Sequence, residues 1–150
     1  MKALISRELD EWLFRNGFDI DNLEKPGKNG DTALMTATRM GELEMVRSLL
    51  QAKANINARN NDGNNALWFA CCRDHIEILH LLLEAGIDLD NQNDNGATAL
   101  MYCASAGKTA TLQILLAAGA NPQLKTLDDF RAIDFAANPK ILEILKRVTV

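Results

Sequence analysis

Apolar residues in this chain recur in two short helical patterns that alternate with polar turns. One full period spans residues 61–93, NDGNNALWFACCRDHIEILHLLLEAGIDLDNQN. Helical spacing marks two apolar faces in it, Ala66, Leu67 and Ala70 on the first and Ile78, Leu79, Leu82 and Leu83 on the second. Gly86 is a typical C-terminal stop for the second helix. Neither predicted helix is long enough to be stable alone, so neighbouring units must bury their apolar faces.

The pattern repeats with a constant step of 33 residues. Four columns of residues follow this step: Gly30, Gly63 and Gly96; Leu34, Leu67, Leu100 and Ile133; Ala37, Ala70, Cys103 and Ala136; and Leu49, Leu82, Leu115 and Val148. Four columns in one register predict a repeat protein. The last column predicts that Leu82 and Leu115 are buried between successive second helices.

These periods resemble ankyrin repeats. The motifs that carry the resemblance are NGDTALMTAT…GELEMVRSLLQAKANIN, DGNNALWFAC…DHIEILHLLLEAGIDLD, NGATALMYCA…GKTATLQILLAAGANPQ and a truncated DDFRAIDFAANPKILEILKRV. WLFRNGFDID, nearer the N-terminus, is similar to the second helix and loop of an earlier half-repeat. The resemblance implies an all-α solenoid of stacked helix–turn–helix units with β-turn-like tips. We expect a single domain with a cap at 1–27, repeats at 28–60, 61–93 and 94–126, and a degenerate capping repeat at 127–150.

Several residues depart from the ankyrin pattern. The histidine of its TPLH motif is replaced by Met35, Trp68, Met101 and Asp134, so we expect the usual histidine hydrogen-bond network to be absent. The last repeat has Asp129 in place of the turn glycine, and Pro139 follows its first helix. Because terminal repeats are atypical, these changes favour a C-terminal cap over an internal piece of a longer array.

Composition and charge narrow the possible partners. The chain has 150 residues, of which 47% are hydrophobic, and its net charge is −4. Residues 61–126 carry three Lys or Arg against seven Asp or Glu, which argues against nucleic acid or an anionic membrane as the partner. No apolar run approaches the roughly 18 residues of a membrane span. Three cysteines without a CxxC pair favour reduced thiols and a cytoplasmic location.

Candidate chemistry is confined to one short segment. Cys71, Cys72 and His75 have a spacing close to that of metal ligands, which leaves a metal- or redox-sensing protein or an enzyme as the alternative function. Zinc needs three or four ligands, however, and the resemblance implies a structural role for His75 and a buried position for Cys71. No nucleophile–base–orienter set, phosphate-binding glycine loop or HExxH motif is present in the sequence. We therefore expect a non-catalytic protein without a cofactor.

The resemblance also implies where a partner binds, because the turn tips and the exposed end of each first helix are the variable positions. The predicted protein-binding residues are Lys28, Asp31, Arg39, Met40, Arg59, Asn61, Asn64, Trp68, Cys72, Arg73, Asp94, Ala97, Ser105, Ala106, Lys125 and Phe130. We expect a monomeric interaction module, acting as an adaptor, an inhibitor or an immunity-type partner. Three arginines beside two large apolar side chains predict an acidic partner segment with an apolar anchor.

Overall fold

The computed structural model describes the backbone of residues 2–150 and the side chains from residue 7 onward. Within that range the secondary structure is helical, with no strand, which confirms the predicted all-α class. The chain divides into two compact units, Met1–Ile87 and Asp88–Val150, and each is described by itself.

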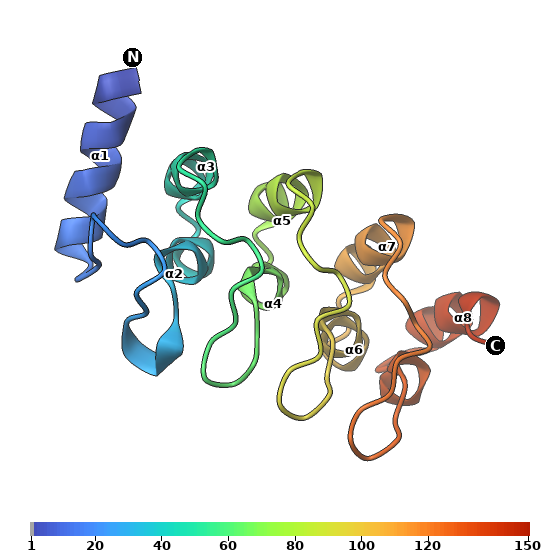
Figure 1. Ribbon diagram of the computed structural model, residues 1–150. Coiled ribbons are helices and arrows are strands. Elements are labelled where there is room, and N and C mark those ends of the chain that lie inside the picture. Colours follow the sequence, from blue (N-terminus) through green and yellow to red (C-terminus); the bar gives the residue numbers. More distant parts are fainter. Residues whose placement is uncertain (1) are drawn as a thin grey trace. The chain divides into compact units, whose positions relative to one another are not determined.

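The first unit contains two helix pairs and an additional helix. Its elements are α1 (Lys2–Arg15), the 3-10 turn η1 (Lys28–Gly30), α2 (Ala33–Met40), α3 (Leu43–Gln51), α4 (Ala66–Cys72) and α5 (Ile76–Glu84). Helix α2 packs on α3 and α4 packs on α5, while α2 lies beside α4 and α3 lies beside both α1 and α5 (Figure 1). Helix α1 thus lies next to α3 on the side opposite to a further helix pair, and its role as a half-repeat cap stays a prediction.

The core of the first unit is formed where these helices meet. Leu34, Leu49, Leu67 and Leu82 are fully buried, which confirms that the repeated apolar columns face inward. Burial of a leucine of this size contributes about 1.5–3 kcal/mol relative to leaving it exposed. The stacked columns therefore supply much of the stability that the short helices lack on their own.

The helices Ala33–Met40 and Ala99–Ser105 begin at side-chain caps, whereas Ala66–Cys72 follows Asn65 without one. Thr98 Oγ1 accepts a hydrogen bond from the Met101 amide at 3.2 Å, and Met101 Sδ accepts one in return from the Thr98 amide at 3.4 Å. Thr32 Oγ1 likewise accepts from the Met35 amide at 3.3 Å. A methionine sulfur therefore completes one capping pair at a position where the histidine of the TPLH motif is missing.

The second unit contains one complete helix pair and a shortened one. Its elements are α6 (Ala99–Ser105), α7 (Thr109–Ala117), the 3-10 helix η2 (Ala132–Phe135) and α8 (Pro139–Val148). Helix α6 packs on α7 and against η2, and η2 contacts α8. The last repeat therefore keeps the order of the others but replaces its first α-helix by one 3-10 turn.

The register of this last helix differs from the sequence prediction. Helix α7 begins at Thr109 and α8 begins at Pro139, a step of 30 residues. As a result Leu145 is buried in the position that corresponds to Leu115, whereas Val148 is 42% exposed. The assignment of Val148 to the buried column is wrong. Proline favours the first position of a helix and an extended residue before it, so α8 starts three residues early.

Candidate protein-binding surface

The ends of the first two inner helices form one exposed surface in the first unit. Arg39 and Met40 lie at the C-terminal end of α2, while Cys72 ends α4 and Arg73 follows it. Because α2 and α4 pack side by side, these four residues lie on neighbouring helix ends, and we call them the α2–α4 surface. Met40 is 48% exposed, Arg73 is exposed and Cys72 is half-buried. Two predicted arginines and an apolar side chain are thus accessible on adjacent helices.

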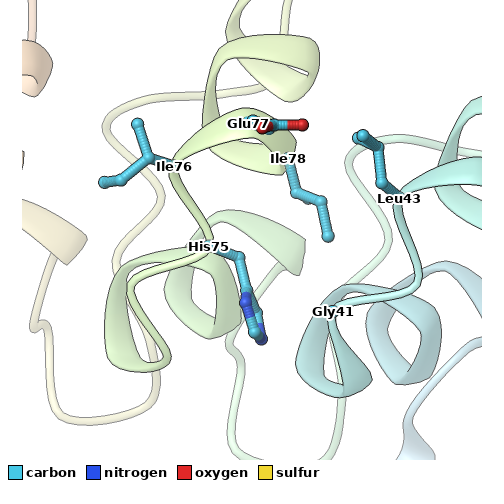
Figure 2. A pocket seen from close by; sticks show the side chains of 6 residues that line it. All are labelled: Gly41, Leu43, His75, Ile76, Glu77 and Ile78. Carbon is cyan, nitrogen blue, oxygen red and sulfur yellow. The ribbon is translucent and has the colours of Figure 1, made fainter.

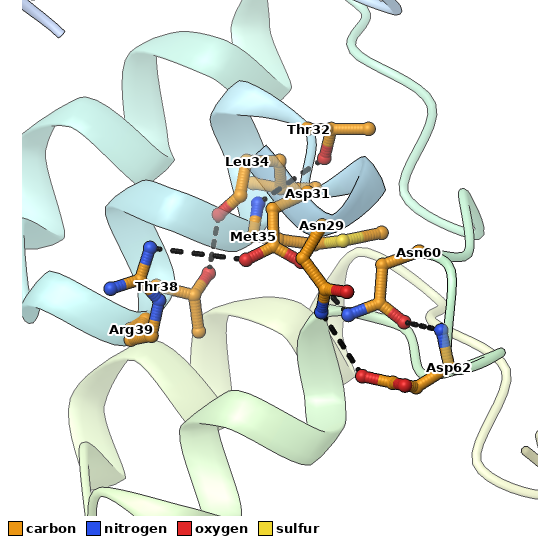
Figure 3. A network of polar contacts seen from close by, with 9 residues as sticks. All are labelled: Asn29, Asp31, Thr32, Leu34, Met35, Thr38, Arg39, Asn60 and Asp62. Atoms are coloured by element: carbon orange, nitrogen blue, oxygen red, sulfur yellow. Dashed lines mark hydrogen bonds and ion pairs between the residues drawn. The ribbon is translucent and has the colours of Figure 1, made fainter. Parts of the chain in front are cut away.

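Arg39 is held by a buried carboxylate beneath the surface. One Arg39 guanidinium nitrogen lies 3.8 Å from Asp31 Oδ2, and the Arg39 side chain is 39% exposed. Asn60 Nδ2 donates to Asp31 Oδ1 at 2.8 Å, so Asp31 links Arg39 to the following turn (Figure 3). Asp31 itself is 7% exposed. Its prediction as an accessible binding residue is wrong, because the next turn covers its carboxylate.

Asn64 is also a structural residue of its turn. Its exposed fraction is 8%, its amide donates to Asn60 Oδ1 at 3.0 Å, and its carbonyl accepts from the Asn60 amide at 2.9 Å. Arg59 is exposed, yet its Nε donates to the Gly63 carbonyl at 3.0 Å. We correct the prediction for Asn64, since the turn uses this residue to close its own hydrogen bonds.

The turn tips of the first unit are tied to one another. Asn29 Nδ2 donates to Asp62 Oδ2 at 3.0 Å (Figure 3). The Asn61 amide also donates to the Asn29 carbonyl at 3.0 Å. Lys28 and Asn61 remain exposed at these tips, whereas Trp68 is half-buried on α4. The sequence did not single out Asn29 or Asn60 as the residues that hold the turns together.

The predicted residues of the second unit lie on corresponding positions. Ser105 and Ala106 are exposed at the end of α6, and Asp94, Lys125 and Phe130 are exposed in the turns, while Ala97 is half-buried. Gln92 Nε2 donates to the Gly96 carbonyl at 3.0 Å and to the Lys125 carbonyl at 2.8 Å. Gln92 therefore joins two turns and has a structural role that the sequence pattern did not predict.

Comparison with known families decides the class of these repeats. A family model described as ankyrin repeats (3 copies) matches the chain over two overlapping ranges, residues 3–93 and 59–126. The chain belongs to the ankyrin-repeat family. Ankyrin repeats are generally protein–protein interaction modules and are typically non-enzymatic. A comparison with curated proteins finds no match.

His75 occupies a structural position within the second of these ankyrin repeats. Its Nε2 donates to the Arg39 carbonyl at 3.2 Å, and its ring packs against Gly41, where an added Cβ would lie 2.8 Å from His75 Cε1. His75 also lines a cleft of about 200 Å³ with Gly41, Leu43, Ile76, Glu77 and Ile78 (Figure 2). The ring therefore fills the space between two consecutive helix–helix turns, as the resemblance implied.

The alternative function at Cys71, Cys72 and His75 receives no support from the geometry. Cys71 is fully buried, and the three cysteines are free thiols. From residue 7 onward, no group of three or more His, Cys, Asp or Glu side chains is placed to hold a metal ion.

None of the helices in the described chain is both long and apolar enough to cross a membrane.

Proposed function

We propose that this chain is a non-catalytic binding module that takes an acidic segment of another protein on the α2–α4 surface. The observation that carries the proposal is the pairing of half-buried Arg39 and exposed Arg73 with exposed Met40 on two adjacent helix ends. Arginine suits this role because its planar guanidinium binds a carboxylate through two parallel hydrogen bonds. An adaptor, inhibitor or immunity-type role belongs to the same proposal.

Asp31 supports the proposal by orienting one of the two arginines. Its side chain is 10% exposed, so it faces Arg39 from below and leaves the outer side of the guanidinium toward solvent. Arginine carries five N–H donors, and the single contact at 3.8 Å engages one nitrogen of the group. A positioned guanidinium loses less conformational entropy on binding than a mobile one.

Met40 supplies the apolar part of the surface. Its thioether side chain is flexible and polarisable, which lets it adapt to partner side chains of different shape. The partner segment should therefore carry one or two carboxylates next to a leucine-like or aromatic residue. Trp68, Arg59, Lys28 and Asn61 extend the proposed surface within the first unit, and Asp94, Ala97, Ser105, Ala106, Lys125 and Phe130 form its counterpart in the second.

A cytoplasmic location and a monomeric state are part of the proposal as well. None of Cys71, Cys72 and Cys103 forms a disulfide, which supports a reducing compartment, because disulfides form and persist in oxidising environments.

Selection from a random peptide library on the immobilised protein tests the proposed function. We expect enriched peptides to carry Asp or Glu beside an apolar residue. Arg39→Glu combined with Arg73→Glu should weaken the best peptide at least about tenfold in a calorimetric titration, with the helical signal unchanged. Enriched peptides without acidic residues would contradict the proposal.

A matched variant separates a local contact from the effect of net charge. Lys140 and Lys146 are exposed on α8, and their double replacement by Glu changes the net charge by the same amount. This control should keep the peptide affinity within about twofold of the unmodified protein. An equal loss of affinity in both double variants would mean that the α2–α4 surface is not the binding site.

A further inference from the structure

Consecutive turns in each unit are joined by one backbone hydrogen bond at a fixed position. The Asn61 amide donates to the Asn29 carbonyl at 3.0 Å, and the Leu127 amide donates to the Asn95 carbonyl at 3.1 Å. Donors and acceptors hold the same places in the 33-residue period in both units. We call these two bonds, one in each unit, the turn ladder.

A glycine next to each acceptor allows the two turns to approach. A Cβ on Gly30 would lie 2.9 Å from the Asn61 amide nitrogen, and one on Gly96 would lie 2.9 Å from the Leu127 amide nitrogen. Real Cβ atoms essentially never come within 3.0 Å of such atoms. A side chain at this position is therefore incompatible with another turn packed beside it.

The last turn has a side chain at this very position. Asp129 takes the place of Gly30 and Gly96 in the period, has the same left-handed backbone with φ 67°, and is exposed. The adjacent Asp128 carbonyl, which corresponds to the Asn29 and Asn95 acceptors, receives no hydrogen bond from the described part of the chain. A left-handed aspartate is less favourable than a glycine, so the residue is kept at some cost in stability.

The first turn presents the group that would pair with this unused acceptor. Lys28 corresponds to the donors Asn61 and Leu127, is exposed, and its amide has no backbone acceptor among residues 2–150. The exposed charges of the two turns are also partly complementary, since Lys25 and Lys28 are basic whereas Asp128 and Asp129, beside Lys125, are acidic. The Lys28 amide and the Asp128 carbonyl thus resemble the unpaired backbone groups at the open edge of a β-sheet, which pair readily with other chains.

We propose that Asp129 closes the end of the turn ladder against the first turn of a second copy of this chain. Without the Cβ, the Lys28 amide of one copy would reach the Asp128 carbonyl of the next, and the contact would repeat head to tail. Head-to-tail contacts that do not close into a ring produce open filaments. Asp129 therefore keeps copies apart. The inference does not depend on the proposed partner.

Asp129→Gly tests the proposal in a concentration series by sedimentation velocity. We expect the dissociation constant for self-association to fall at least about tenfold below that of the unmodified protein. Asp74→Gly is the matched control, because it removes the same side chain and the same charge from another left-handed position, with φ 57°. Asp129→Ala removes the charge but keeps Cβ. Both controls should associate no more than the unmodified protein.

A second arm tests which surface of the second copy is involved. Lys25→Glu with Lys28→Glu, placed in the Asp129→Gly chain, should reverse the gain in association through repulsion from Asp128. The proposal fails if Asp129→Gly associates no more than Asp74→Gly. It also fails if Asp129→Ala associates as strongly as Asp129→Gly, or if the lysine replacements leave the gain unchanged.

Discussion

The helix pair α6–α7 and the pair η2–α8 follow one repeated sequence pattern, but they bury different numbers of its apolar side chains. Helix α6 buries Ala99, Leu100, Met101, Cys103 and Ala104, whereas η2 buries Ala132 alone. Helix α7 buries Leu112, and the corresponding Leu142 of α8 is 36% exposed. Repeats of one chain can therefore share a sequence pattern and still bury it to different extents, because burial depends on the neighbouring elements that each repeat packs against.

Truncation of the buried leucines gives the largest expected effect on stability, and the contrast with exposed Val148 tests the register of α8. Leu115→Ala and Leu145→Ala should each lower the free energy of unfolding by about 2–5 kcal/mol, because each removes a fully buried side chain. Leu82→Ala should do the same in the first unit. Val148→Ala should cost less than about 1 kcal/mol, since this side chain is largely exposed. Urea titration measures all four, and equal losses for Val148 and Leu145 would refute the 30-residue register of α8.

The sequence predicted the regular repeats well because their helices are set by local periodicity. The burial of Leu82 and Leu115 follows directly from the 33-residue columns. The register of α8 was missed because Pro139 changes where the helix begins, and an ungapped column carries no information about such a shift. The shortening of the first helix to the 3-10 helix η2 becomes visible only in the structure.

The polar residues of the turns were predicted less well than the apolar core. Asp31 and Asn64 look like surface residues in the sequence, and both are buried. Their burial depends on Asn60, which reaches the Asp31 carboxylate from a turn 29 residues away. The exposure of residues at helix ends, such as Met40, was predicted correctly by contrast, because it follows from the helical period alone.

The N-terminal cap of α8 gives a smaller expected effect. Asn138 Oδ1 accepts a hydrogen bond from the Ile141 amide at 2.9 Å, whereas α5 and α7 begin without a side-chain cap. Asn138→Ala should therefore destabilise the protein by about 1 kcal/mol, and Asn138→Asp should retain most of the stability. Thermal unfolding of both variants measures the effect. A loss as large for Asn138→Asp as for Asn138→Ala would show that the cap is not responsible.

Left-handed residues at the helix ends give the smallest expected effect, and it is a gain. Lys53 has φ 68° where the next repeat has Gly86, and Asp74 has φ 57° where Gly41 and Gly107 occupy the neighbouring repeats. Lys53→Gly and Asp74→Gly should each stabilise the protein by about 0.5–1 kcal/mol, because glycine adopts this backbone without steric cost. Chemical denaturation measures the gain. Gly107→Asp, the reverse change, should be destabilising, and a neutral result there would argue against backbone strain.

Hydrogen exchange of the protein with and without a selected acidic peptide tests the central claim most directly. The account predicts slower exchange at the helix ends and turns of residues 39–43 and 72–76, with little change in the outer helices α3 and α5. Arg39→Glu with Arg73→Glu should abolish this protection at the same peptide concentration. Protection centred on α3 and α5, with the helix ends unchanged, would contradict recognition through the α2–α4 surface.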